Sequence, residues 1–347
     1  MFNDTNNNAT GVLEESDLIE QNATESIIET DWKLKLVWRN IIFMIYIHIS
    51  FIYSWYVLFT SALGKTILYA ILMMIFTGFG LTAGAHRLWT HKAYKATKKL
   101  KVFLVILNSM AFQGSIIDWA RDHRSHHKYS ETDADPHNPK RGLFFSHIGC
   151  LMSRKHPAVF EKSKNIDFND LLSEPILIFQ KKYYPIIMPI MTFIIPTLIP
   201  IYFWNETFYS SYFMNIWRYT ITLNGTLSIN SITHHVGNRP YDKNMYGTEV
   251  SYISVLSLGE GSHNYHHVFP WDYKCSEFGN YSLNLTCIFL DLMAKIGWAH
   301  DLKTVSKETI KNRVLRTGDG THPVWGWGDK DQRLEDKENV KIIYKRI

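Results

Sequence analysis

Four apolar segments constrain what this chain can fold into, because each is long enough to cross a lipid bilayer as a helix. They cover residues 41–59, 66–84, 183–203 and 208–229. A helix needs roughly 20 mainly apolar residues to cross about 30 Å of hydrocarbon. The connectors inside the first pair and inside the second pair are short, so each pair is expected to form a hairpin. The sequence therefore predicts an all-α integral membrane protein with four transmembrane helices in two hairpins.

The distribution of basic residues orients these hairpins. Residues 92–182 contain sixteen Lys and Arg, whereas the two short connectors carry one Lys between them. The positive-inside rule places the long basic segment in the cytosol, and both termini with it. Residues 1–32 are rich in Asn, Thr and acidic side chains, which predicts a disordered cytosolic tail. The remaining residues, 33–347, form the membrane domain, with a cytosolic helical cap made of residues 85–182 and 230–347.

Composition excludes two classes of protein. The formal net charge is +5, but the basic residues fall between and after the apolar segments and form no stripe interleaved with aromatic residues. Nucleic acid is therefore not an expected partner. The chain has three cysteines and no CxxC spacing, so neither a disulfide framework nor a thiolate metal site is indicated.

The histidines form three tight clusters, joined by a fourth element that pairs an Asn with a His. The clusters are His86 and His91; His123, His126 and His127; and His263, His266 and His267, with Asn230 and His234 as the fourth element. The spacing i, i+3, i+4 in the second and third clusters puts three imidazoles on one face of a helix. The first two histidines are five residues apart, about 140° around an ideal helix. That spacing suits a helix end, where the geometry can open.

All four elements fall at cytosolic span ends or in the cap, so they can converge on one site. Nine imidazoles and one Asn exceed what a single tetrahedral zinc accepts, which makes two metals the natural count. Imidazole suits iron, copper, nickel and zinc, so the ligand type does not choose the metal. Histidines that occur singly are expected to be packing or hydrogen-bonding residues: His48, His137, His147, His156, His300 and His322.

A fifth apolar stretch, residues 101–117, is not expected to be a span. A crossing there would place the histidines before it and after it on opposite sides of the membrane, where they could not share a site. An amphipathic helix lying in the membrane interface fits better. Residues 285–298 also alternate like a helix that packs on the cap or on the membrane surface.

Four motifs carry a resemblance to a known family. They are Thr-Ala-Gly-Ala-His-Arg-Leu-Trp-Thr-His (82–91), Trp-Ala-Arg-Asp-His-Arg-Ser-His-His-Lys (119–128), Asn-Arg-Pro-Tyr-Asp (238–242) and Gly-Glu-Gly-Ser-His-Asn-Tyr-His-His (259–267). With these motifs the chain resembles the membrane fatty acyl-CoA desaturases of the stearoyl-CoA type, and closely resembles their insect members. The match runs from about Trp38 to Gly320.

The resemblance implies a histidine-rich di-iron centre and an acyl-CoA substrate. The two Fe²⁺ ions would be ligated by the nine clustered histidines, and Asn230 would reach one iron through water. The coenzyme A portion would be bound by Asn40, Arg121, Asp122, Arg154 and Lys155. Guanidinium and ammonium groups suit phosphates. The expected setting is the endoplasmic reticulum membrane and its lipid, with electrons from cytochrome b5 and NADH-cytochrome b5 reductase, in unsaturated fatty acid biosynthesis for lipids or pheromone precursors.

Five residues are candidates for the path of the acyl chain. Gly114 and Leu227 stand where many relatives carry Asn and Trp, and Trp119 belongs to the second motif. Met74 and Gly78 precede His86 by several helical turns and are candidates for the deep end of a tunnel. A separate expectation concerns Arg218, which sits inside the fourth span and needs a structural partner there.

Two other functions compete with desaturation. A di-iron hydroxylase or acetylenase would use the same histidines and leave a different product. A histidine-rich metal transporter would pass ions between clusters instead of holding two, but ligands inside the membrane are missing from the sequence. Product analysis separates the first alternative, and metal stoichiometry with acyl-CoA turnover separates the second.

Overall fold

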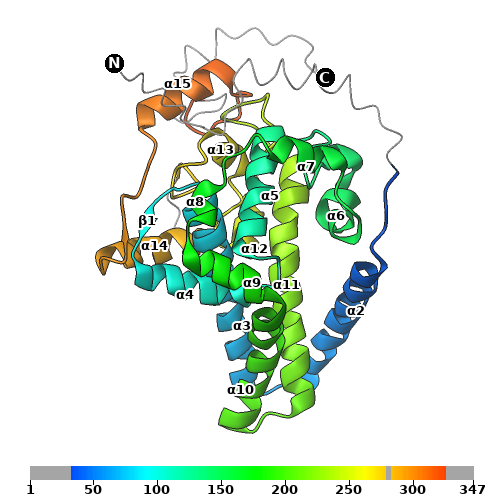
Figure 1. Ribbon diagram of the computed structural model, residues 1–347. Helices are drawn as coiled ribbons and strands as arrows, with labels where there is room; N and C mark the ends of the chain where they lie inside the picture. The colour runs from blue at the N-terminus through cyan, green and yellow to red at the C-terminus, as the bar shows by residue number, and fades with distance from the viewer. Residues whose placement is uncertain (1–32, 279–282, 326–347) are drawn as a thin grey trace, which may run out of the picture.

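Helices make up nearly all of the regular structure, as predicted (Figure 1). The computed structural model describes residues 33–278 and 283–325, so the predicted tail and the end of the predicted cap lie outside the described residues. In the membrane-side half the helices are α2 (Trp38–Thr60), α3 (Gly64–Phe79), the π-helix η1 (Gly80–Thr90), α4 (Lys98–Ser109), α9 (Pro175–Pro189), the π-helix η4 (Ile190–Ile194), α10 (Ile195–Trp204) and α11 (Phe208–His235).

The cap is built from shorter elements. Its helices are α5 (Ile116–Tyr129), η2 (Pro139–Arg141), η3 (Phe145–Gly149), α6 (Cys150–Met152), α7 (Pro157–Ser163), α8 (Asn169–Leu172), α12 (Ser251–Ser257), α13 (His263–Val268), α14 (Leu285–Lys295) and α15 (Lys307–Thr317). One antiparallel pair of two-residue strands, β1 (Lys95–Ala96) and β2 (Ala299–His300), is the exception to an all-helical fold. It ties the segment after the first histidine pair to the segment after α14.

Among residues 33–278 and 283–325, three helices are long and apolar enough to cross a membrane. They are Trp38–Thr60, Gly64–Thr90, in which α3 continues into η1, and Pro175–Trp204, in which α9, η4 and α10 form one rod. These correspond to three of the four predicted segments, and each is longer than its apolar core. The third begins eight residues earlier than predicted, at Pro175, where a proline suits the first helical turn.

The fourth predicted segment forms α11, which is long but polar. It has 28 residues, and Asn215, Arg218 and Asn224 interrupt its apolar sequence. α11 packs along α2, α3 and α10 (Figure 1). Asn215 and Arg218 are buried in this packing. The polar residues lower the mean hydropathy of α11, which is why length and composition identify three of the described helices as spans and not α11.

The buried Arg218 has partners, although none of those recorded is a carboxylate. Its guanidinium donates to Asn215 Oδ1 (3.0 Å), Thr77 Oγ1 (3.1 Å), Thr192 O (3.0 Å) and Met110 O (3.3 Å). Four neutral oxygens thus accept hydrogen bonds from the Arg218 guanidinium, whose partner could not be identified from the sequence. The side chain joins the long helices to each other, as a structural role requires.

The stretch 101–117 does not form one continuous helix. α4 ends at Ser109, and at about 1.5 Å per residue its 12 residues are too short to cross a bilayer. Phe112 and Gly114 then take positive φ angles of 51° and 96°, which turn the chain into α5. The expectation that this stretch is not a span is confirmed.

Candidate metal centre

Four helical segments bring the clustered histidines to one place at one end of the long helices. η1 carries His86 and is capped by His91, α5 carries the second cluster, α13 carries the third, and His234 lies in the last turn of α11. The π-helical geometry of η1 accounts for the five-residue spacing of His86 and His91. Its bonds run between residues five apart, as in His91 N–H to His86 O (3.1 Å), so the two imidazoles share one face.

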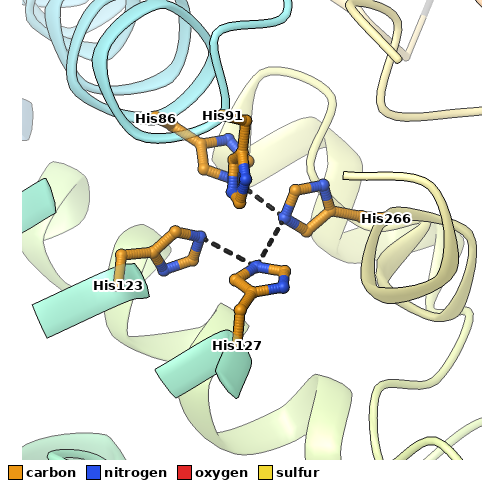
Figure 2. A group of neighbouring side chains, drawn as sticks. All are labelled: His86, His91, His123, His127 and His266. Atoms are coloured by element: carbon orange, nitrogen blue, oxygen red, sulfur yellow. Dashed lines mark hydrogen bonds between the residues drawn. The ribbon is translucent and has the colours of Figure 1, made fainter. Parts of the chain in front are cut away.

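The nine imidazoles fall into two buried groups. The first contains His86, His91, His123, His127 and His266, and the second contains His126, His234, His263 and His267. Within each group the candidate ligand atoms all lie within 4.8 Å of one another. Figure 2 shows the first group, in which the Nε2 atom of His266 is 3.0 Å from that of His86 and 2.9 Å from that of His127. In the second group, His263 Nε2 lies 3.0 Å from His234 Nε2 and 2.9 Å from His267 Nε2.

The protonation of these rings suits a cation. Burial, and secondly the neighbouring imidazoles, lower the pKa of His123, His127 and His266 well below the ordinary value. The rings are therefore neutral near pH 7, and each offers one nitrogen lone pair. Buried ring nitrogens such as His91 Nε2 and His126 Nε2 have no hydrogen-bond partner, and an orphaned buried acceptor is costly. Two metal ions, one in each group, would satisfy these lone pairs, so the residues present fit a metal pair.

Two carboxylates behind the imidazoles fix their orientation. Asp135 Oδ1 and Oδ2 each lie 3.0 Å from His126 Nδ1, and Glu260 Oε2 lies 3.2 Å from His86 Nδ1. Burial alone would raise the pKa of Glu260, but Arg87 and His86 hold it at about 2. Such partners fix the tautomer of a ligating histidine, so that Nε2 is left to face a metal. Both acids were missed as site residues, although the glutamate lies inside the Gly-Glu-Gly motif, where it could have been found.

A third group of potential ligands does not favour a metal. His86, Glu260 and Cys275 lie close together and are buried. However, the guanidinium of Arg87 occupies the same place and donates to Glu260 Oε1 from Nη2 (2.9 Å) and Nε (3.2 Å). A fixed positive charge in contact with the carboxylate would repel a cation there. None of the singly occurring histidines among residues 33–278 and 283–325 belongs to any of these groups.

A pocket leads from the histidines into the space between α3 and α11. The space in it not occupied by atoms is about 700 Å³, a volume that includes space open to solvent. Its lining consists of Met74, Gly78, Leu81, Thr82, His86, Trp119, His123, Thr222, Thr226, Ile229, Asn230, Leu256, Ser257, Leu258, Glu260 and His263. Both histidine groups thus contribute to the wall, and Asn230 lies beside them. The rest of the lining is mostly apolar, as a hydrocarbon chain requires.

The five predicted tunnel residues divide between two places. Met74, Gly78 and Trp119 line the pocket. Gly114 and Leu227 are not among the lining residues. The first donates its N–H to Tyr184 Oη (2.8 Å), and the second is buried in an apolar cluster with α2.

The residues expected at coenzyme A lie on three segments linked by the one before α7, which contacts the start of α2 on one side and α5 on the other. The predicted set is Asn40, Arg121, Asp122, Arg154 and Lys155. Lys155 pairs with Asp122, and Arg121 Nη2 lies 3.5 Å from Asp118. Arg154 N–H donates to Lys35 O (2.8 Å), which holds this segment against the residues preceding α2. Asn40 Nδ2 donates to a neighbouring backbone carbonyl, that of Leu151 (2.7 Å).

Comparison with known proteins finds one family model and several relatives, all of them described as desaturases. The model of the fatty acid desaturase family matches residues 65–276. The chain is 51% identical over 348 residues to an acyl-CoA Delta-9 desaturase of Acheta domesticus, an alignment that covers 97% of each chain. It is 50% identical to an acyl-CoA Delta12-desaturase of the same organism, over 96% of each chain. It is also 50% identical to stearoyl-CoA desaturase 4 of Mus musculus, over 84% of this chain and 82% of the relative.

Proposed function

The chain belongs to the fatty acid desaturase family and is an oxidoreductase that desaturates a fatty acyl-CoA, and on that premise we propose that two iron ions carry the reaction. The five-histidine group would hold one ion and the four-histidine group the other. Asn230, which lies on the pocket wall, would complete the second site through water. When bound, the iron pair supplies an oxidant made from dioxygen, which unactivated methylenes require.

The position of the two histidine groups on the pocket wall is the observation that supports this proposal most strongly. His86 and His123 come from the first group and His263 from the second, and all three line the pocket. An acyl chain in the pocket would therefore place its methylenes beside both metals. The apolar wall would exclude water and fix which methylenes face the metals, with Met74 and Gly78 towards the closed end.

The chain's other residues would bind and position the substrate. Arg121, Arg154 and Lys155 offer charge to the phosphates of coenzyme A, while the side chains of Asn40 and Asp122 shape the same surface. The Asp122 carboxylate pairs with Lys155 in the unliganded chain, so phosphate binding would exchange one partner of the ammonium group for another.

The proposed topology has α11 as a fourth membrane-spanning helix. At about 1.5 Å per residue its 28 residues are longer than the hydrocarbon core, and its polar side chains are paired with other helices. Four crossings would return both termini to the cytosolic side. The proposed setting is the endoplasmic reticulum membrane, where cytochrome b5, reduced through NADH-cytochrome b5 reductase, would deliver two electrons.

Expression in a desaturase-deficient host tests the function. We expect a monounsaturated acyl product, located by mass spectrometry of derivatised double bonds. His263→Ala is expected to abolish the product while the protein stays in the membrane, whereas His300→Ala, at an exposed position outside both groups, keeps it. Activity retained by His263→Ala would reject that ligand. A hydroxylated or acetylenic product would instead favour the hydroxylase or acetylenase alternative.

A further inference from the structure

Three short helices meet the rod formed by α3 and η1 at three consecutive residues, around the junction of α3 with η1. A Cβ atom placed on Gly78 would lie 2.3 Å from Leu258, the residue that ends α12. The ring of Phe79 stacks on Phe289 of α14 with centroids 4.5 Å apart. A Cβ on Gly80 would lie 2.2 Å from the backbone nitrogen of Asn108 in α4. We call α4, α12 and α14 the collar, because all three pack at one level of the same helix.

The collar contacts α3 at a depth that falls inside the hydrocarbon core of a bilayer. α3 begins at Gly64, so Gly78 and Gly80 are about 21 and 24 Å along the helix from its start. The hydrocarbon core is about 30 Å thick, and any tilt of the helix shortens the rise further. Elements in contact with α3 at this level are therefore at the depth of lipid.

Each collar helix presents apolar side chains that nothing in the described chain covers. On α12, Tyr252, Val255 and Leu256 are 60%, 61% and 51% exposed. On α14 the exposed residues are Ile288, Leu292 and Ile296, spaced by four, and on α4 they are Val102 and Ile106. Residues four apart share one helix face, so each helix has an outward apolar stripe. Contiguous apolar surface of this kind marks a contact with a membrane or a partner.

Basic residues at the ends of α4 and α14 favour the membrane as the contact of the apolar stripes. Lys98 and Lys99 are exposed in the first turn of α4, and Lys295 is exposed at the end of α14. Exposed lysines beside an apolar stripe are typical of helices that lie in the interface, where the ammonium groups meet phosphates. The apolar stripes are also continuous with α3, which is itself apolar enough to span the bilayer.

We infer that the outer faces of α4, α12 and α14 are immersed in the acyl chains of the adjoining lipid leaflet. Leu256 is half exposed and also lines the pocket, so α12 alone separates the pocket from lipid at this point. This last consequence rests on the proposed function: an acyl product would be one short helix away from the bilayer. The lipid contact itself depends only on the membrane depth of the collar.

Spin labels on single introduced cysteines test the inference in the full chain, reconstituted in phospholipid nanodiscs. Val255→Cys and Leu292→Cys report on the collar. Ile49→Cys, exposed in the middle of α2, is the lipid control, and Lys311→Cys, exposed on α15 at the far end of the cap, is the water control (Figure 1). Collision of each label with oxygen, which concentrates in lipid, is compared with collision with a water-soluble nickel chelate. The unsubstituted protein, labelled in parallel, corrects for the partly exposed Cys150.

The expected result is that both collar labels match the lipid control, with oxygen accessibility above nickel accessibility. Collar labels that match the water control would overturn the inference. Labels reached by neither reagent would also overturn it, because protein, such as a second copy, would then cover the stripes. Acyl-CoA turnover is measured in each sample, so that failure of the lipid contact is distinguished from failure of the proposed function. Tyr252→Cys and Ile296→Cys replace either collar variant if it is not recovered folded.

Discussion

Replacing Glu260 by glutamine would disturb the metal centre without touching a ligand. The Glu260 carboxylate accepts two hydrogen bonds from Arg87 on Oε1, and its Oε2 lies 3.2 Å from His86 Nδ1. In the variant, the amide oxygen can still face Arg87, but the amide NH₂ would then face His86. An NH₂ donor there favours the tautomer with the imidazole proton on Nε2, the nitrogen that faces the other ligands.

The size of the effect follows from the role of the carboxylate. Loss of a partner behind a metal-ligating histidine typically costs about 10- to 100-fold in metal affinity or activity. At about 1.4 kcal/mol per factor of ten, this is about 1.4–2.8 kcal/mol. The buried guanidinium of Arg87 also loses its counter-charge, and breaking a buried ion pair costs about 3–5 kcal/mol when nothing replaces it. Glutamine keeps one acceptor, so the loss of folding stability should fall below that range.

The assay counts metal per chain by elemental analysis after purification of matched samples, and measures turnover at saturating and at limiting iron. Glu260→Gln is expected to hold about tenfold less iron at limiting supply, with turnover partly restored by excess. Glu260→Asp keeps a carboxylate and should retain more iron. Glu308→Gln, the same change at an exposed position on α15, should behave like the unchanged protein. Unchanged iron content in Glu260→Gln would refute the assignment of this carboxylate.

Three further outcomes follow from the described contacts. Gly80→Ala puts a Cβ 2.2 Å from backbone and should lower stability by about 1–3 kcal/mol, whereas Gly64→Ala meets nothing within 4 Å and should stay within about 0.5 kcal/mol, as thermal unfolding in detergent would reveal. Gly78→Leu must displace the side chain of Leu258, which also lines the pocket, so the two side chains together narrow it. Turnover of long acyl-CoAs should then fall by about tenfold or more relative to short ones in competition assays, and an unchanged chain-length profile would argue against this end of the tunnel. Burial alone would raise the pKa of Asp170, but Arg124 holds it below its ordinary value of 3.8. This carboxylate therefore stabilises the fold fully above pH 3.8 and loses that contribution as the pH falls through the lower folded value. The deficit of Asp170→Asn in thermal stability, about 1–2 kcal/mol at pH 7, should then shrink in acid, and a deficit independent of pH would contradict the pairing.

The sequence predicted the histidine clusters well because their signal is local. His123, His126 and His127 share a helix face by spacing alone, and α5 places them as expected. The spacing of His86 and His91 predicted a helix end, and His91 does cap η1. The π-helical form of η1 was not predicted, because it depends on backbone hydrogen bonds and not on the type of any one residue. The division of the nine histidines into a group of five and a group of four depends on how four helices pack together. It therefore could not be predicted from the spacing of the histidines in the sequence.

Other features depend on contacts between distant segments. Glu260 pairs with Arg87, 173 residues away in sequence, and Arg218 donates to oxygens of residues up to 141 positions away. The hydropathy of α11 predicted a span, yet its polar side chains make it the least apolar of the long helices. Leu227 lies in the α2 contact and not on the pocket, because its helix turns that face away from α3.

Iron content of active protein tests the central claim most directly. The purified chain, reconstituted with lipid, cytochrome b5 and its reductase, is assayed for acyl-CoA turnover against iron per chain as iron is removed by chelation and restored. Turnover should rise with iron to a plateau at two ions per chain, and zinc should not replace it. Full turnover with less than one iron per chain, or an equal rate with zinc alone, would contradict a pair of irons held by the two histidine groups.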